Sequence, residues 1–191
     1  MSERCQLLDA VASLKVPGPL RAHFVASQAL PVAMYGAALS YTGASLLAKL
    51  AHHVAKAHWG PRKVMGRSPQ VVRCLTAGPY VHRTNPWIVA LREGMRVWHQ
   101  SLRVGGTRAA HLLGVLRGCC AGGLPGQSGL VGSVGPVYRV LLECAFRVRV
   151  VGGTVGVSSR VADSMSGEVV LGVDSLQVVW EFIAKGVVQW E

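Results

Sequence analysis

The stretch NPWIVALREGMRVWHQSLR, residues 85–103, has the clearest structural pattern in this chain of 191 residues. Asn85 followed by Pro86 indicates a helix start, because an Asn side chain accepts hydrogen bonds from the first helical amides and proline suits the first helical position. After this start, large apolar residues recur at spacings of four and three, the period of one helix face. They are Trp87, Leu91, Met95, Trp98 and Leu102. We therefore predict an amphipathic helix here.

The adjacent face of this helix is basic. Arg92, Arg96, His99 and Arg103 follow one another at spacings of four, three and four. Long cationic side chains along an exposed face, beside an apolar stripe that fixes the helix, can bind the phosphates of nucleic acid. A merely solvated basic face has the same pattern, but it normally includes acids as i,i+4 partners, and here only Glu93 is present.

The sequence before residue 85 predicts further helices. They cover residues 5–15, residues 20–35 with a break at Pro31, residues 44–58 and residues 69–77; another covers 108–117. In the helix over 44–58, an apolar face formed by Leu46, Leu47, Leu50 and Val54 lies beside a second basic face. The loop that follows contains a third basic group. These candidate phosphate-binding residues are Lys49, His52 and Lys56 on the helix, and Arg62, Lys63 and Arg67 in the loop.

Charge is distributed unevenly along the chain. Residues 10–117 hold 14 Lys or Arg and one acid, Glu93, for a net charge of +13. Residues 118–191 hold five bases and six acids, for a net charge of −1. The first part is therefore expected to meet a polyanion, either nucleic acid or an anionic membrane surface.

Several other classes of site are not indicated. The basic part lacks the paired carboxylates that usually hold Mg²⁺ for phosphoryl transfer, so we expect no catalytic residues. His53 and His58 are five residues apart and do not share one helix face, so we expect no metal site and no cofactor. The side chains of His52, His53 and His58 are instead expected to be solvated or to face phosphate. The five cysteines are an odd number without a Cys-x-x-Cys pair, which favours reduced thiols inside a cell. The N-terminus lacks a hydrophobic signal core, so the protein is expected in the cytoplasm or nucleus and not to be secreted.

Residues 22–48 are a candidate membrane-spanning segment. Residues 22–48 contain no Lys, Arg, Asp or Glu, which meets the length rule for a spanning helix. However, polar residues and two glycines interrupt the stretch, Pro31 breaks it, and its commonest residue is alanine. A buried pair of helices is the favoured interpretation, and a small membrane-associated protein is the alternative.

The last third of the chain has a different pattern. Residues 118–135 contain seven glycines and predict a linker. A helix is expected over 136–146, followed by a β-hairpin over 147–158 around Gly152 and Gly153, and a third strand over 167–173. Asp174 is expected to cap a final amphipathic helix. The fold class is thus mainly α, with a basic helical region over 1–117, the linker over 118–135 and a small α+β tail over 136–191, in which the hairpin precedes the amphipathic helix.

The order of several motifs resembles the region after the catalytic palm in reverse transcriptases of non-LTR (LINE-type) retrotransposons. The segments LKVPGPLR (14–21) and ALPVAMYG (29–36) resemble the Leu-Pro…Tyr-Gly element that leads into the thumb of that family. The resemblance covers roughly residues 11–103, and more weakly 135–151, where Gly135-Pro136-Val137 resembles a helix after the thumb. Later matches to the family pattern are Leu46, Leu50, Trp59, Gly60 and the Asn85-Pro86 helix start.

The resemblance implies a thumb-like helical bundle that lies against the template–primer duplex, a role carried only onto the basic faces named above. It does not imply polymerase activity, because the metal-binding aspartates of the family lie in a Tyr/Phe-x-Asp-Asp turn that this chain lacks. We therefore expect a fragment that binds DNA or an RNA–DNA duplex through its backbone, without activity of its own. A decayed reading frame without selected function remains a further alternative, and the oligomeric state is open.

Overall fold

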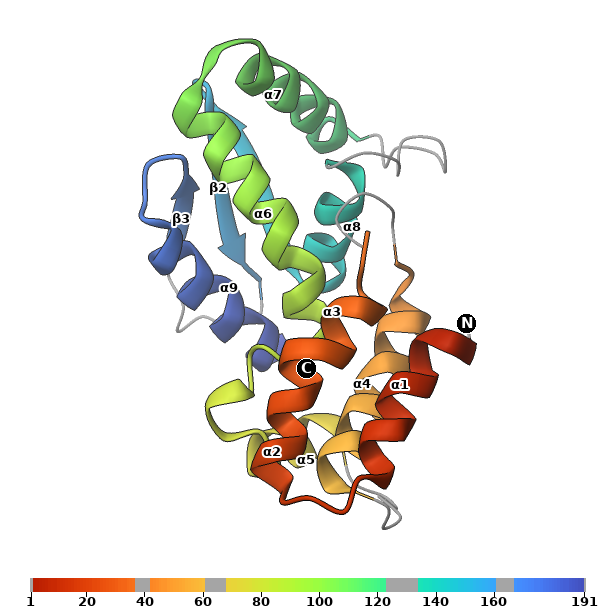
Figure 1. Ribbon diagram of the computed structural model, residues 1–191. Coiled ribbons are helices and arrows are strands. Elements are labelled where there is room, and N and C mark those ends of the chain that lie inside the picture. Colours follow the sequence, from red (N-terminus) through yellow and green to blue (C-terminus); the bar gives the residue numbers. More distant parts are fainter. Residues whose placement is uncertain (1, 37–41, 61–67, 123–133, 161–166, 191) are drawn as a thin grey trace. The chain divides into compact units, whose positions relative to one another are not determined.

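Helices make up most of the computed structural model, and a small three-stranded antiparallel sheet lies near the C-terminus (Figure 1). The predicted fold class, mainly α with a small α+β tail, is confirmed. The structure describes residues 2–36, 42–60, 68–122, 134–160 and 167–190. The chain forms two compact units, residues 1–35 with 43–89 and residues 36–42 with 90–191.

The first unit is helical and is built around one long helix. Its elements are α1 (Ser2–Ser13), α2 (Gly18–Phe24), the π-helical η1 (Val25–Ala29), α3 (Leu30–Ala33), α4 (Ala44–Trp59), α5 (Pro69–Thr76) and the 3₁₀ turn η2 (Gly78–Tyr80). α1, α2 and α5 all contact α4. The predicted apolar face of α4 is buried at Leu47, Leu50 and Val54, each 0% exposed, while Leu46 is half-buried.

The predicted break at Pro31 takes the form of a π-helical segment just before that residue. The Leu30 amide donates to the Val25 carbonyl, five residues back. A wider turn is one way to relieve the clash between a proline ring and the carbonyl four residues earlier. The chain then resumes α-helical geometry through Ala33.

The second unit combines helices with the sheet. Its helices are α6 (Pro86–Val104), which starts in the first unit, α7 (Gly106–Cys120), α8 (Gly135–Glu143) and α9 (Leu176–Trp190). Its strands, β1 (Phe146–Val151), β2 (Thr154–Ser159) and β3 (Glu168–Leu171), pair in that order. α9 contacts β3, and the rings of Phe146 and Phe182 lie 6.2 Å apart between sheet and helix.

The predicted hairpin is confirmed in its position and turn. Val151 pairs with Thr154, which leaves Gly152 and Gly153 as a two-residue loop. Both glycines have positive φ, 56° and 86°, as the tight turn of a two-residue hairpin requires. Arg147 pairs with Ser158, so their side chains share one face of the sheet.

α5 begins at Pro69 as expected, and Ser68 makes no side-chain cap there. The prediction for Asp174 differs from the structure. Asp174 does not cap α9, because its carboxylate accepts a hydrogen bond from the Val170 amide at 2.6 Å. The Ser175 hydroxyl instead accepts from the Val178 amide at 3.3 Å at the start of α9.

The units also divide the chain differently from the predicted parts. α7 continues to Cys120, three residues past the expected end of the basic region, and it contacts β1 and α8. Its buried face, which includes Leu112 and Leu116, therefore groups residues 90–122 with the tail. Most of the predicted linker, residues 123–133, lies outside the described residues.

Candidate nucleic-acid interface

The basic face of α6 rests on a well-anchored helix. The Asn85 carboxamide oxygen accepts hydrogen bonds from the Trp87 amide at 2.9 Å and the Ile88 amide at 3.4 Å, as the sequence predicts for a helix cap. Leu91, Met95 and Trp98 are 0% exposed. The predicted apolar stripe is therefore buried, which fixes the direction in which the neighbouring arginines point.

Three of the predicted α6 residues are exposed: Arg92, Arg96 and Arg103. The Arg96 guanidinium donates to the Glu93 carboxylate at 2.9 Å, in a pair with both side chains more than half exposed. Such exposed pairs are worth little, about 0.2–1 kcal/mol, and are screened by salt. Within the described residues Arg92 and Arg103 form no ion pair, so their charges are available to a phosphate.

His99 was predicted to belong to this face, and that prediction is wrong. The side chain is only 4% exposed, and its Nδ1 accepts a hydrogen bond from the Gly172 amide at 3.2 Å. Burial lowers the pKa of His99, and the nearby Arg103 lowers it further, while Asp174 has the opposite effect. The imidazole is thus neutral at pH 7, and it joins α6 to the turn after β3 instead of binding an anion.

A cavity of about 490 Å³ lies beside this basic face, within the second unit. Arg96 and Arg103 line it from the same face of α6, seven residues apart, and His99 also contributes to the wall. Gln100 lies between them, four residues after Arg96, and its amide can donate to a phosphate oxygen. Gln100 carries no charge, so the charge pattern does not predict it, although its spacing of four from Arg96 indicates the same helix face.

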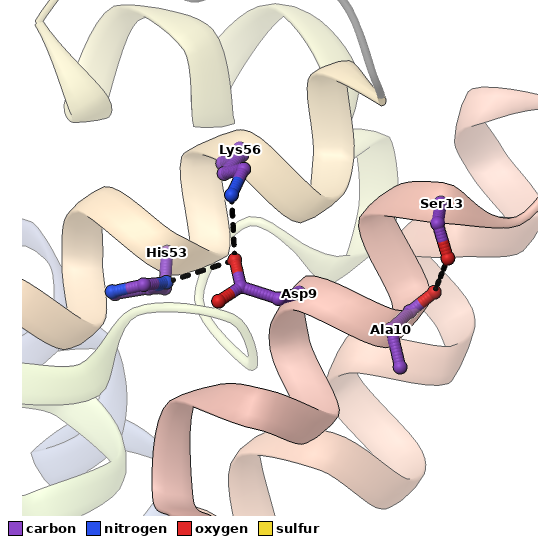
Figure 2. A network of polar contacts seen from close by, with 5 residues as sticks. All are labelled: Asp9, Ala10, Ser13, His53 and Lys56. Carbon is purple, nitrogen blue, oxygen red and sulfur yellow. Dashed lines mark hydrogen bonds and ion pairs between the residues drawn. The ribbon is translucent and has the colours of Figure 1, made fainter. Parts of the chain in front are cut away.

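The basic face of α4 in the first unit is partly neutralised. Lys49, His52 and Lys56 are exposed as predicted. However, the Lys56 ammonium donates to the Asp9 carboxylate at 2.8 Å, and His53 Nδ1 lies 3.1 Å from the same oxygen. Figure 2 shows Asp9 of α1 reaching both side chains of α4. Burial raises the pKa of Asp9, but the bonds from Lys56 and His53 outweigh this effect and bring it below 3.8.

Two further bases of the first unit are buried and cannot contact a polyanion. Arg73 is 1% exposed and His58 is 0% exposed. Thr76 donates its hydroxyl to the Val72 carbonyl at 2.6 Å, so the 3.2 Å contact between its oxygen and His58 Nδ1 has the imidazole as donor. Burial, followed by the charges of Arg73 and Arg21, lowers the pKa of His58 to about 4. The expectation of a solvated or phosphate-facing imidazole at this position is wrong.

The predicted basic residues belong to different parts of the chain. The α4 face belongs to the first unit and the exposed α6 arginines belong to the second. The three loop residues Arg62, Lys63 and Arg67 lie outside the described residues. Among the predicted binding residues that the structure describes, α6 supplies the group of exposed bases with the least compensation by acids.

Comparisons with known proteins do not assign the chain to a family. No family model, curated protein or solved structure matches the chain. Within the described residues, no helix is long and apolar enough to cross a membrane. The apolar run over 22–48 is divided among α2, η1, α3 and α4 in its described parts.

Proposed function

We propose that this protein binds the backbone of double-stranded nucleic acid through electrostatic contacts made by α6, with a smaller contribution from α4. The observation that carries the proposal is the pair of exposed arginines, Arg92 and Arg103, which lie beside the buried face of their helix and have no acid partner among the described residues. The excess of 14 bases over one acid in residues 10–117 supports it. Binding of this kind is nonspecific in sequence and falls steeply with salt.

The proposal extends to the origin of the chain. Its motif order resembles the thumb of non-LTR reverse transcriptases, and a thumb helix against a template–primer duplex would use an exposed basic face of this type. The proposed role is binding without polymerisation. The sequence has only three aspartates, Asp9, Asp163 and Asp174, and no two of them are adjacent, as a Tyr/Phe-x-Asp-Asp turn would require.

The test is a salt titration of duplex binding with the full chain. Replacing Arg92, Arg96 and Arg103 by Gln keeps the helix propensity nearly unchanged. It should lower the log–log salt slope by about 2–3 units, since each phosphate contact contributes about 0.9. A matched variant with Arg147→Gln and Arg149→Gln on β1 should change the slope much less.

Two results would overturn the proposal. One is an absence of duplex binding by the unaltered protein at about 50 mM salt, a condition that strongly favours electrostatic association. The other is an unchanged salt slope in the α6 variant while circular dichroism shows that the helices are intact.

A further inference from the structure

A second basic cavity lies at β1, and none of the residues that the sequence predicted to bind lines it. It has a volume of about 400 Å³ and lies wholly within the second unit. Three arginines line it: Arg147 and Arg149 on β1 and Arg160 just after β2. The remaining wall is formed by Cys120, Tyr138, Leu142, Val148, Val150 and Val151.

The three arginines are exposed, and within the described residues none of them forms an ion pair. Among the described strand residues, one acid shares this face of the sheet: Glu168 pairs through Ser158 with Arg147 across the three strands. Its carboxylate lies over Gly156, where an added Cβ would come within 1.8 Å of the carboxylate oxygen. Three cations and this one carboxylate leave the region with an excess of positive charge.

The backbone of β1 adds hydrogen-bonding groups to the same cavity. β1 is an edge strand of the described sheet, and the Cys120 thiol donates to the Val148 carbonyl at 3.4 Å, so this carbonyl points away from β2. Residues two apart on an antiparallel strand direct their backbone groups the same way. The amide of Val150 is therefore directed to the outer edge, where Val150 lines the cavity.

The tyrosine in the wall adds no negative charge. Its hydroxyl donates to the Cys119 carbonyl at 3.3 Å, which fixes the ring in place. Burial, followed by the neighbouring Cys120, raises the pKa of Tyr138 to about 12. The phenol thus stays neutral at physiological pH. The arginines therefore give the cavity its positive charge.

We propose that this cavity binds the phosphate group of a small phosphomonoester. Arginine is suited to this ligand because its planar fork can give two parallel hydrogen bonds to phosphate oxygens. The volume lies in the range of small-molecule sites, about 300–1,000 Å³. Leu142 and Val151 provide an apolar wall for the carbon part of the ligand. The site does not depend on duplex binding by α6, so it goes beyond the proposed function.

The experiment is isothermal titration calorimetry on the full chain with three probes: ribose 5-phosphate, ribose and inorganic phosphate. We expect heat of binding from ribose 5-phosphate and none from ribose. Binding of inorganic phosphate as tight as that of ribose 5-phosphate would assign the ligand as free phosphate and overturn the choice of a phosphomonoester. Equal binding of ribose and ribose 5-phosphate would overturn the site altogether.

Variants locate the binding. Replacing Arg147, Arg149 and Arg160 by Gln should weaken ribose 5-phosphate binding at least about tenfold, because hydrogen bonds to charged groups are the strong ones. The α6 variant with Arg92, Arg96 and Arg103 replaced by Gln is the matched control and should keep the affinity of the unaltered protein. The reverse pattern, or an unchanged affinity in the β1 variant, would overturn the proposal.

An amide-resolved measurement avoids any dependence on the folding of variants. In nitrogen–proton correlation spectra of the unaltered protein, ribose 5-phosphate should shift the amides of Arg149 and Val150. Shifts confined to α6, around Arg103, would place the phosphate elsewhere and contradict the proposal. Duplex binding that persists in the β1 variant, with ribose 5-phosphate binding lost, separates this site from the proposed function of α6.

Discussion

α4 and α6 have similar sequence patterns, with an apolar stripe beside a basic one. In the folded chain, however, the two basic faces differ in the acidic side chains that contact them. On α4, Lys56 and His53 meet Asp9, which comes from α1 more than 40 residues away in sequence. On α6, Arg92 and Arg103 meet no acid among the described residues, and Arg96 meets only its exposed neighbour Glu93. The charge that a basic helix offers to a ligand is therefore set by the helix packed beside it.

The two helices also share a feature that the spacing of residues along the sequence does not reveal. Each carries a histidine that the sequence assigned to a solvated or binding face, and each of these histidines is buried: His58 on α4 and His99 on α6. His58 donates toward Thr76, while His99 accepts from Gly172. His99 can accept only as a neutral imidazole, and burial with the nearby charges of Arg73 and Arg21 lowers the pKa of His58, so both positions connect stability to pH.

The largest expected effect is on the pH dependence of stability in the first unit. With a pKa of about 4 when folded and 6.5 when unfolded, His58 leaves stability intact above pH 6.5. As pH falls from 6.5 to about 4, the unfolded chain binds a proton that the folded chain does not, which costs about 3 kcal/mol. Thermal melting at pH 7, 5.5 and 4 should show this loss.

The variant His58→Gln should flatten that profile, because Gln can still donate to Thr76 and does not titrate. His111, which is exposed on α7, provides the control: His111→Gln should leave the profile unchanged. If His58→Gln retained the full loss between pH 6.5 and 4, the buried imidazole would not be its source.

The next effect tests how α6 is held in the second unit. A Cβ added at Gly94 would lie 2.0 Å from a methyl carbon of Val137 on α8. Gly94→Ala should therefore destabilise the protein by about 1–3 kcal/mol through overpacking. Gly114, within α7, has no atom within 4 Å of an added Cβ, so Gly114→Ala should stabilise by about 0.5–1 kcal/mol. Urea denaturation of the two variants measures both changes in the free energy of unfolding.

If both alanines had the same effect, the close approach of α6 and α8 would not be what holds the arginine face in place. A stabilising Gly94→Ala would contradict the packing of α6 on α8 directly. A destabilising Gly114→Ala would instead point to a contact on α7 that the present geometry lacks.

The helical pattern was predictable from sequence because helix starts and apolar periods are local. The start at Pro86, the hairpin at Gly152 and the apolar face of α4 follow from residues a few positions apart. The partners were not predictable, because they come from distant segments. Asp9 lies 47 residues before Lys56, and Gly172 lies 73 residues after His99. Asp174 suited a helix cap by its position, but the Val170 amide competes for its carboxylate.

A smaller effect compares the two basic faces directly by double substitution. Arg92→Gln with Arg103→Gln should lower the salt slope of duplex binding by about 2 units, because each of these charges is available for one phosphate. Lys49→Gln with Lys56→Gln should lower it by about 1 unit, because Lys56 is already bound to Asp9. Salt titrations against one duplex give both numbers. Equal decreases would mean that Asp9 does not compensate the α4 face.

The smallest effect, and the most direct one, converts the α4 face into one like that of α6. Asp9→Asn removes the carboxylate that binds Lys56 and lies beside His53, while the amide keeps the size of the side chain. The released Lys56 can then take one further phosphate, so the salt slope should rise by up to about 0.9 units. Glu93→Gln on α6 is the matched control. Glu93 is 58% exposed against 38% for Asp9, so solvent already screens its pair with Arg96 more strongly. The slope should therefore rise less for Glu93→Gln than for Asp9→Asn. A larger rise for Glu93→Gln would place the compensating acid on α6, and the difference drawn between the two helices would be reversed.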